Sequence, residues 1–69
     1  MLRERLKQAF VSHANGHIDK HLANVEVLLE SPVGVGKKGD IIQEIETELE
    51  EVAKYHDLIE MMEKYFPEW

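Results

Sequence analysis

The 69-residue chain is predicted to be all-α, an antiparallel two-helix hairpin of the coiled-coil type. Apolar residues recur every three or four positions in both halves of the chain, which is helical periodicity. The two periodic segments are equally long, and a glycine-rich segment joins them. We therefore expect a single domain over 1–69, with a helix over about 2–30, a loop over 31–39, a helix over about 40–66 and a short aromatic tail over 67–69.

The first helix is predicted from apolar residues at steps of three and four. They are Leu2, Leu6, Phe10, Ala14, Ile18, Leu22, Val25 and Leu29. Asn15 and Gly16 interrupt this stripe, and a glycine costs about 1 kcal/mol relative to alanine inside a helix. The stripe resumes in phase afterwards, so we expect one continuous helix. It ends at Ser31, because the residue before Pro32 resists helical geometry.

The second helix has a predicted start at Asp40, whose side chain can cap it, with Gln43 completing a capping box. Pro67 stops it after about Phe66. A heptad seam follows steps of three and four residues. Its predicted members are Ile42, Ile45, Leu49, Val52, His56 and Ile59. Folding the chain about Val35 pairs residues whose numbers sum to roughly 70, so that His21 lies opposite Leu49.

The charge is divided between the halves of the chain. Residues 1–39 hold six Lys/Arg and four Asp/Glu, a net of +2, whereas residues 40–69 hold two Lys and ten Asp/Glu, a net of −8. The total of −6 argues against a nucleic-acid partner, which needs a basic face. No apolar run reaches the roughly 20 residues that cross a bilayer, and the charged start MLRERLKQAF lacks the core of a signal peptide. We expect a soluble protein without disulfides, since cysteine is absent.

Two helices cannot cover all the apolar surface of this chain. The apolar positions of the first helix occupy roughly half of its circumference, more than one neighbouring helix can cover. We expect the remainder to meet a second copy or a larger assembly. The residues predicted to contact a partner are Val11, Ile18, Leu22, Leu29, Met62, Tyr65 and Trp69.

Four histidines form the most distinctive pattern. His13, His17 and His21 are spaced by four and share one face of the first helix, and His56 approaches His13 across the hairpin. A neighbouring pair of them could chelate zinc. However, the HExxH motif is absent, and each successive imidazole is displaced around the helix axis, so that all three cannot bind one ion. We favour a packing or interface role over metal binding or catalysis, and we predict no cofactor. Protonation of such histidines would also make an interface sensitive to pH.

The loop segment GVGKKG satisfies G-x-G-x-x-G, but no strand precedes it, so we interpret it as a hairpin turn and not as a dinucleotide site. Lys37 and Lys38 beside the second helix are predicted to contact a carboxylate or phosphate of a partner.

The segments HANGHIDKH, ANVEVLL, SPVGVG and AKYHD resemble small uncharacterised helical proteins of tailed bacteriophages, notably marine ones. The resemblance covers about Leu6 to Phe66 and implies a viral origin, hence the host cytoplasm or the virion. Many members have Glu-His where this chain has Lys37 and Lys38, which puts a shared role of the loop charge in doubt. The resemblance carries over no active or binding residues.

Taken with the apolar surface, this resemblance favours a non-enzymatic structural module, a virion accessory or cement-like assembly protein. Two alternatives stay open. One is a phage regulator that lays an amphipathic helix on a host or phage enzyme. The other is a small histidine-rich helical bundle that binds metal.

Overall fold

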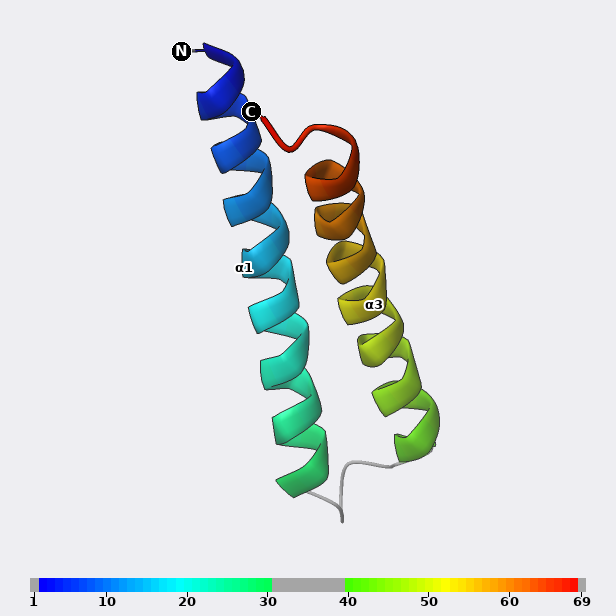
Figure 1. The fold of residues 1–69 in the computed structure, drawn as a ribbon. Helices are drawn as coiled ribbons and strands as arrows, with labels where there is room; N and C mark the ends of the chain where they lie inside the picture. Colours follow the sequence, from blue (N-terminus) through cyan, green and yellow to red (C-terminus); the bar gives the residue numbers. More distant parts are fainter. Residues whose placement is uncertain (1, 31–39, 69) are drawn as a thin grey trace.

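A computed structural model describes residues 2–30 and 40–68 of the chain. Helix α1 (Leu2–Glu30) and helix α3 (Ile41–Tyr65) run antiparallel along a body of 50 × 16 × 14 Å (Figure 1). The predicted all-α helical hairpin is confirmed. The loop over 31–39, with Lys37 and Lys38, and the tail residue Trp69 lie outside the described residues. Neither described helix is long and apolar enough to cross a membrane.

The helix ends follow the sequence signals. The Asp40 carboxylate accepts hydrogen bonds from the backbone N–H groups of Ile42 and Gln43, at 3.1 and 3.3 Å, so the predicted N-cap is confirmed. Gln43 does not complete a capping box, because its side-chain amide donates to the Thr47 hydroxyl at 3.4 Å. At the other end the Phe66 N–H donates to the Met62 carbonyl at 2.9 Å, one residue before the proline.

Helix α1 is continuous through Asn15 and Gly16, as predicted. A Cβ atom on Gly16 would meet nothing within 4 Å. The glycine therefore serves no close helix–helix approach in the described part of the chain. Its cost is the ordinary conformational cost of glycine in a helix.

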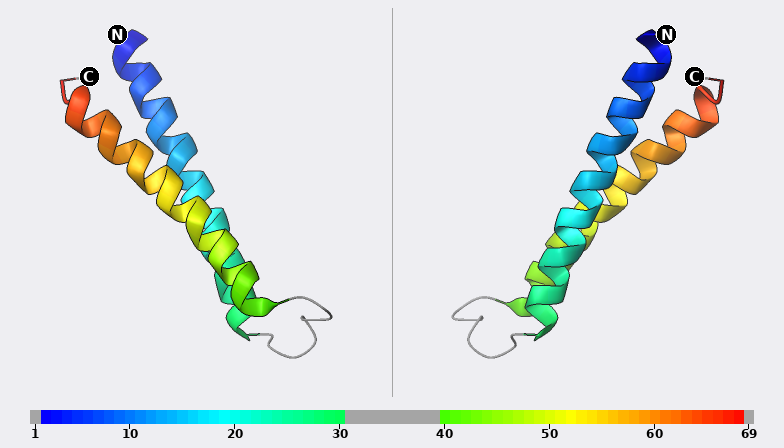
Figure 2. Two further views of the ribbon diagram at one scale, coloured as in Figure 1. Left: turned by 90° about the vertical axis from the view of Figure 1, so that its right-hand side faces the viewer. Right: turned by 90° about the vertical axis from the view of Figure 1, so that its left-hand side faces the viewer.

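The core between the helices is small. Ala14, at 0% exposure, is the one fully buried residue in the described ranges, and it lies near the middle of α1. Figure 2 shows that the two helices are inclined to one another and separate towards the end where α1 begins. A small side chain at position 14 fits a close approach of the two backbones, and the divergence opens the hairpin beyond it.

The predicted register is confirmed by contacts across the hairpin. Lys7 pairs with Glu63, and His21 with Glu48, so residue numbers sum to 70 and 69.

Half of the residues predicted for the seam of α3 do not face α1, because the helix is rotated about its own axis relative to the predicted orientation. Three expected seam residues point outward, Ile42 at 73% exposure, Leu49 at 45%, and His56. The less exposed residues of α3 also step by four and three. They are Ile41, Ile45, Glu48, Val52, Tyr55, Ile59 and Met62, and Glu51 beside Val52 is half-buried as well.

The polar residues of α1 explain this rotation. The part of α1 that faces α3 includes His17, His21 and Asn24, all of them half-buried. Polar groups removed from water need hydrogen-bond partners, which Leu49 cannot supply and Glu48 can.

Candidate functional site

A polar cluster joins the two helices near the loop end. The Glu48 carboxylate accepts hydrogen bonds from the His21 ring at 2.6 Å and from the Asn24 amide at 3.0 Å. The side chains of His21 and Glu48 keep only 13% and 24% exposure. The bonds from His21 and then Asn24 hold the pKa of Glu48 below its ordinary value. This cluster fixes the register of the hairpin.

An aromatic stack lies beside that cluster. The His17 ring lies flat on Tyr55, with centroids 4.3 Å apart and an interplanar angle of 7°. The His13 ring makes edge-to-face contacts with both, with its centroid 4.6 Å from that of His17 and 6.2 Å from that of Tyr55. The histidine column of α1 therefore contacts α3 through Tyr55, the neighbour of the residue that the sequence predicted.

His17 lies where a positive charge is unfavourable. Its Nδ1 is buried and has no hydrogen-bond partner among the described residues. Burial lowers the pKa of His17, and the positive fields of His13, Lys20, His21 and Lys54 lower it further. Protonation of His17 is therefore less favourable in the folded hairpin than in the unfolded chain, so that it opposes folding.

The four histidines do not converge on a metal ion. Within the described ranges no three His, Asp or Glu side chains form a group that could hold one. His56 is 67% exposed and lies 3.8 Å from Glu60 on its own helix, while Tyr55 occupies the place opposite His13. The predicted approach of His56 to His13 is therefore wrong. The contacts of His13, His17 and His21 are those of a packing role.

The predicted interface residues do not form one patch. Leu22 and Leu29 are exposed on α1, and Val11 and Ile18 are half-buried. Tyr65 is exposed near the far end of α3. The remaining predicted residues are half-buried Met62 and Trp69, the latter outside the described residues.

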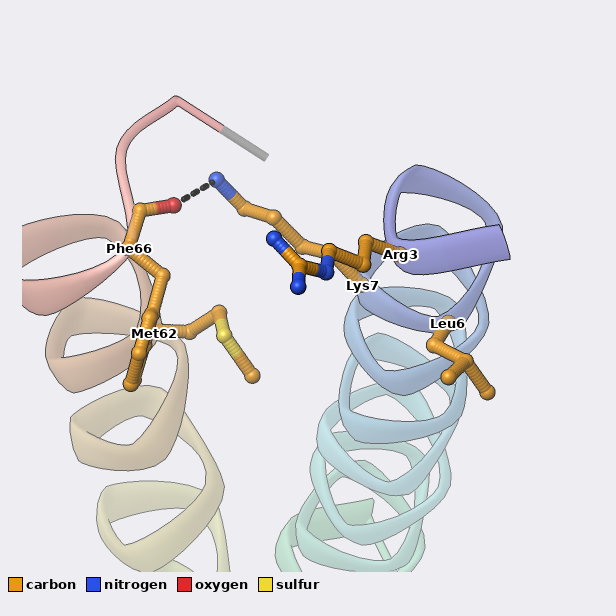
Figure 3. A pocket seen from close by; sticks show the side chains of 5 residues that line it. All are labelled: Arg3, Leu6, Lys7, Met62 and Phe66. Atoms are coloured by element: carbon orange, nitrogen blue, oxygen red, sulfur yellow. Dashed lines mark hydrogen bonds between the residues drawn. The ribbon is translucent and has the colours of Figure 1, made fainter. Parts of the chain in front are cut away.

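The open end of the hairpin carries two adjoining apolar hollows. The first, of about 260 Å³, is lined by Arg3, Leu6, Lys7, Met62 and Phe66 (Figure 3). The Lys7 ammonium donates to the Phe66 carbonyl at 2.9 Å and to Glu63 at 3.3 Å, which ties the two helix ends together. The second hollow, of about 470 Å³, is lined by Phe10, Leu58, Met61, Met62, Tyr65 and Phe66.

A third hollow lies on α3 alone, where the sequence predicted the seam. This hollow, here called the α3 groove, has a volume of about 490 Å³. Its lining residues are Ile42, Ile45, Glu46, Leu49, Glu50 and Ala53. Sequence reasoning missed it because it assigned Ile42 and Leu49 to the contact with α1. The available signal was that α3 has apolar residues at two neighbouring heptad positions, of which α1 covers only one.

The chain matches no family model, no curated protein and no solved structure. The function is therefore inferred from the sequence and from the geometry of the described residues.

Proposed function

We propose that this chain is a non-enzymatic interaction subunit, a helical hairpin whose exposed apolar surface is covered by protein in an assembled bacteriophage particle. The observation that supports the proposal is the ratio of buried to exposed apolar residues. Within the described ranges one residue is fully buried, whereas eleven large apolar side chains are exposed. Monomeric proteins seldom leave so much apolar surface in water.

The size of the chain strengthens this reasoning. Domains of fewer than about 70–80 residues rarely gain enough stability from one small core, and they rely on a disulfide, a metal or a partner. Cysteine is absent from the sequence, and the histidines of the described ranges form no metal group. A protein partner is the remaining means of stabilisation.

The phage setting comes from the sequence resemblance. A cement-like accessory protein uses such a surface continuously, as part of the particle. A regulator would use it transiently, by laying one helix on an enzyme. We favour the accessory protein, because the exposed apolar residues are distributed over both helices and both ends of the hairpin.

Two measurements test the proposal. Quantitative mass spectrometry of purified particles of the encoding phage should find the chain in many copies. A regulator would be absent from the particles and would bind an enzyme in the infected cell. Sedimentation and thermal unfolding over about a hundredfold range of concentration should reveal self-association as a rise in Tm.

A pair of variants locates the surface. Leu22→Glu should weaken assembly while leaving the helical content unchanged, because Leu22 is exposed and lies outside the contact with α3. Ala23→Glu is the matched control, since it adds the same charge at the next exposed position. A fully stable monomer that is missing from the particles would contradict the proposed function.

A further inference from the structure

The α3 groove is an apolar strip with an acidic edge. Its apolar residues step along α3 by three and four positions, from Ile42 to Ala53. This is the spacing with which one helix receives the side chains of another. Eleven steps of 1.5 Å give a length of about 17 Å, or roughly three helical turns. Glu46 and Glu50 line the same hollow.

The charged residues along this part of α3 have one sign. Residues 40–53 contain six acidic residues and no lysine or arginine. Three of the six have partners: Asp40 caps α3, Glu48 binds His21, and Glu51 lies 3.2 Å from the Lys54 ammonium. Glu46 and Glu50 have no hydrogen bond or ion pair within the part of the chain that the structure describes.

Lys54, the first lysine that follows the groove along α3, forms no ion pair with Glu46 or Glu50. Lys54 is held by Glu51 and lies over the Tyr55 ring, 4.8 Å from its centroid. Its charge is therefore engaged with side chains on the seam side of α3. Within the described ranges, the groove therefore combines apolar residues with two carboxylates that form no ion pair.

We propose that the α3 groove docks an amphipathic helix whose apolar stripe is flanked by lysine or arginine. This inference rests on the proposed function and names its partner class. The apolar stripe of the partner would cover Ile42 and Leu49, and its cations would meet Glu46 and Glu50. Pairing of this groove with the same groove of a second copy is disfavoured, because it would bring the Glu46 and Glu50 carboxylates of both copies together. An anionic membrane surface is disfavoured by the same repulsion.

The test uses two synthetic helical peptides with the same leucine stripe, one flanked by lysine and the other by glutamate. Fluorescence anisotropy of the labelled peptides with the full chain measures binding. The lysine-flanked peptide should bind, with an affinity that falls as salt rises, and the glutamate-flanked peptide should bind at least about tenfold more weakly.

Three variants assign the binding to the groove. Leu49→Asp should abolish it, whereas Leu58→Asp should leave it unchanged, since Leu58 is similarly exposed, at 39%, but lies outside the groove. The double change Glu46→Lys and Glu50→Lys should reverse the preference, so that the glutamate-flanked peptide binds better. Equal binding of both peptides, or loss of binding in Leu58→Asp alone, would overturn the inference.

Sedimentation of the same samples gives the oligomeric state of the chain, which distinguishes failure of this inference from failure of the proposed function. A dimer that binds neither peptide would overturn the basic-helix assignment and leave the proposed function standing, with a second copy over the groove. A stable monomer that binds neither peptide would overturn the inference, and its absence from particles would overturn the proposed function as well.

Discussion

Replacing Tyr55 with alanine should destabilise the hairpin strongly, whereas the same change at the neighbouring His56 should not. Tyr55 stacks on His17 and makes an edge-to-face contact with His13, while His56 is exposed. An aromatic pair contributes about 0.5–1.5 kcal/mol beyond the burial of its area. The lost burial of a half-buried tyrosine adds a similar amount, so we expect Tyr55→Ala to cost about 1–3 kcal/mol.

The comparison isolates packing because tyrosine and histidine have similar helix propensities, so the gain from alanine cancels between the two variants. Thermal unfolding followed by far-ultraviolet circular dichroism, at one protein concentration, gives both Tm values. A loss of 1 kcal/mol corresponds to roughly 4–8 °C in a domain of this size. His56→Ala should stay within about 0.5 kcal/mol of the parent. Equal losses in both variants, or a larger loss for His56→Ala, would refute the orientation of α3 described above.

Three further predictions concern α1, the start of α3 and pH. Gly16→Ala should raise the stability by about 0.5–1 kcal/mol in urea unfolding, since the added methyl meets open space. Asp40→Ala should lower it by about 1 kcal/mol in the same assay, through loss of the N-cap. Burial and neighbouring cations lower the pKa of His17 in the folded chain. The contribution of neutral His17 to the free energy of unfolding should therefore be complete above the ordinary histidine pKa, and it should be lost as the pH falls through the lowered pKa of the folded state. Tm measured from about pH 8 to about pH 5 should show this loss, and His17→Gln should reduce it.

The fold was predictable because helical periodicity, a capping aspartate and stop signals at proline are local properties. Asp40 caps α3 and α1 ends at Glu30, close to where the sequence placed both boundaries. The register was predictable as well, because two helices of similar length joined by one loop have few ways to align. The pair of Lys7 with Glu63 confirms that alignment.

The orientation of α3 about its axis was not predictable from apolar spacing alone. Neighbouring pairs such as Glu48 and Leu49 satisfy the same heptad steps when either member faces α1. Apolar spacing favours Leu49, yet the structure turns Glu48 inward. The choice depends on hydrogen bonds with His21 and Asn24 on the other helix. A pattern within one helix contains no information about the partners that the opposite helix offers.

That choice links the polar seam to the exposed apolar surface. With Glu48 in the seam, Leu49 and Ile42 must face outward, because one rotation of the helix places all of them. A polar group in a helical seam specifies register at a cost in stability. The hairpin thus gains a defined alignment from its polar cluster and forgoes the burial that its apolar residues would provide. A partner on the α3 groove would recover that burial without disturbing the register, which is why we expect folding and docking of this chain to be energetically coupled.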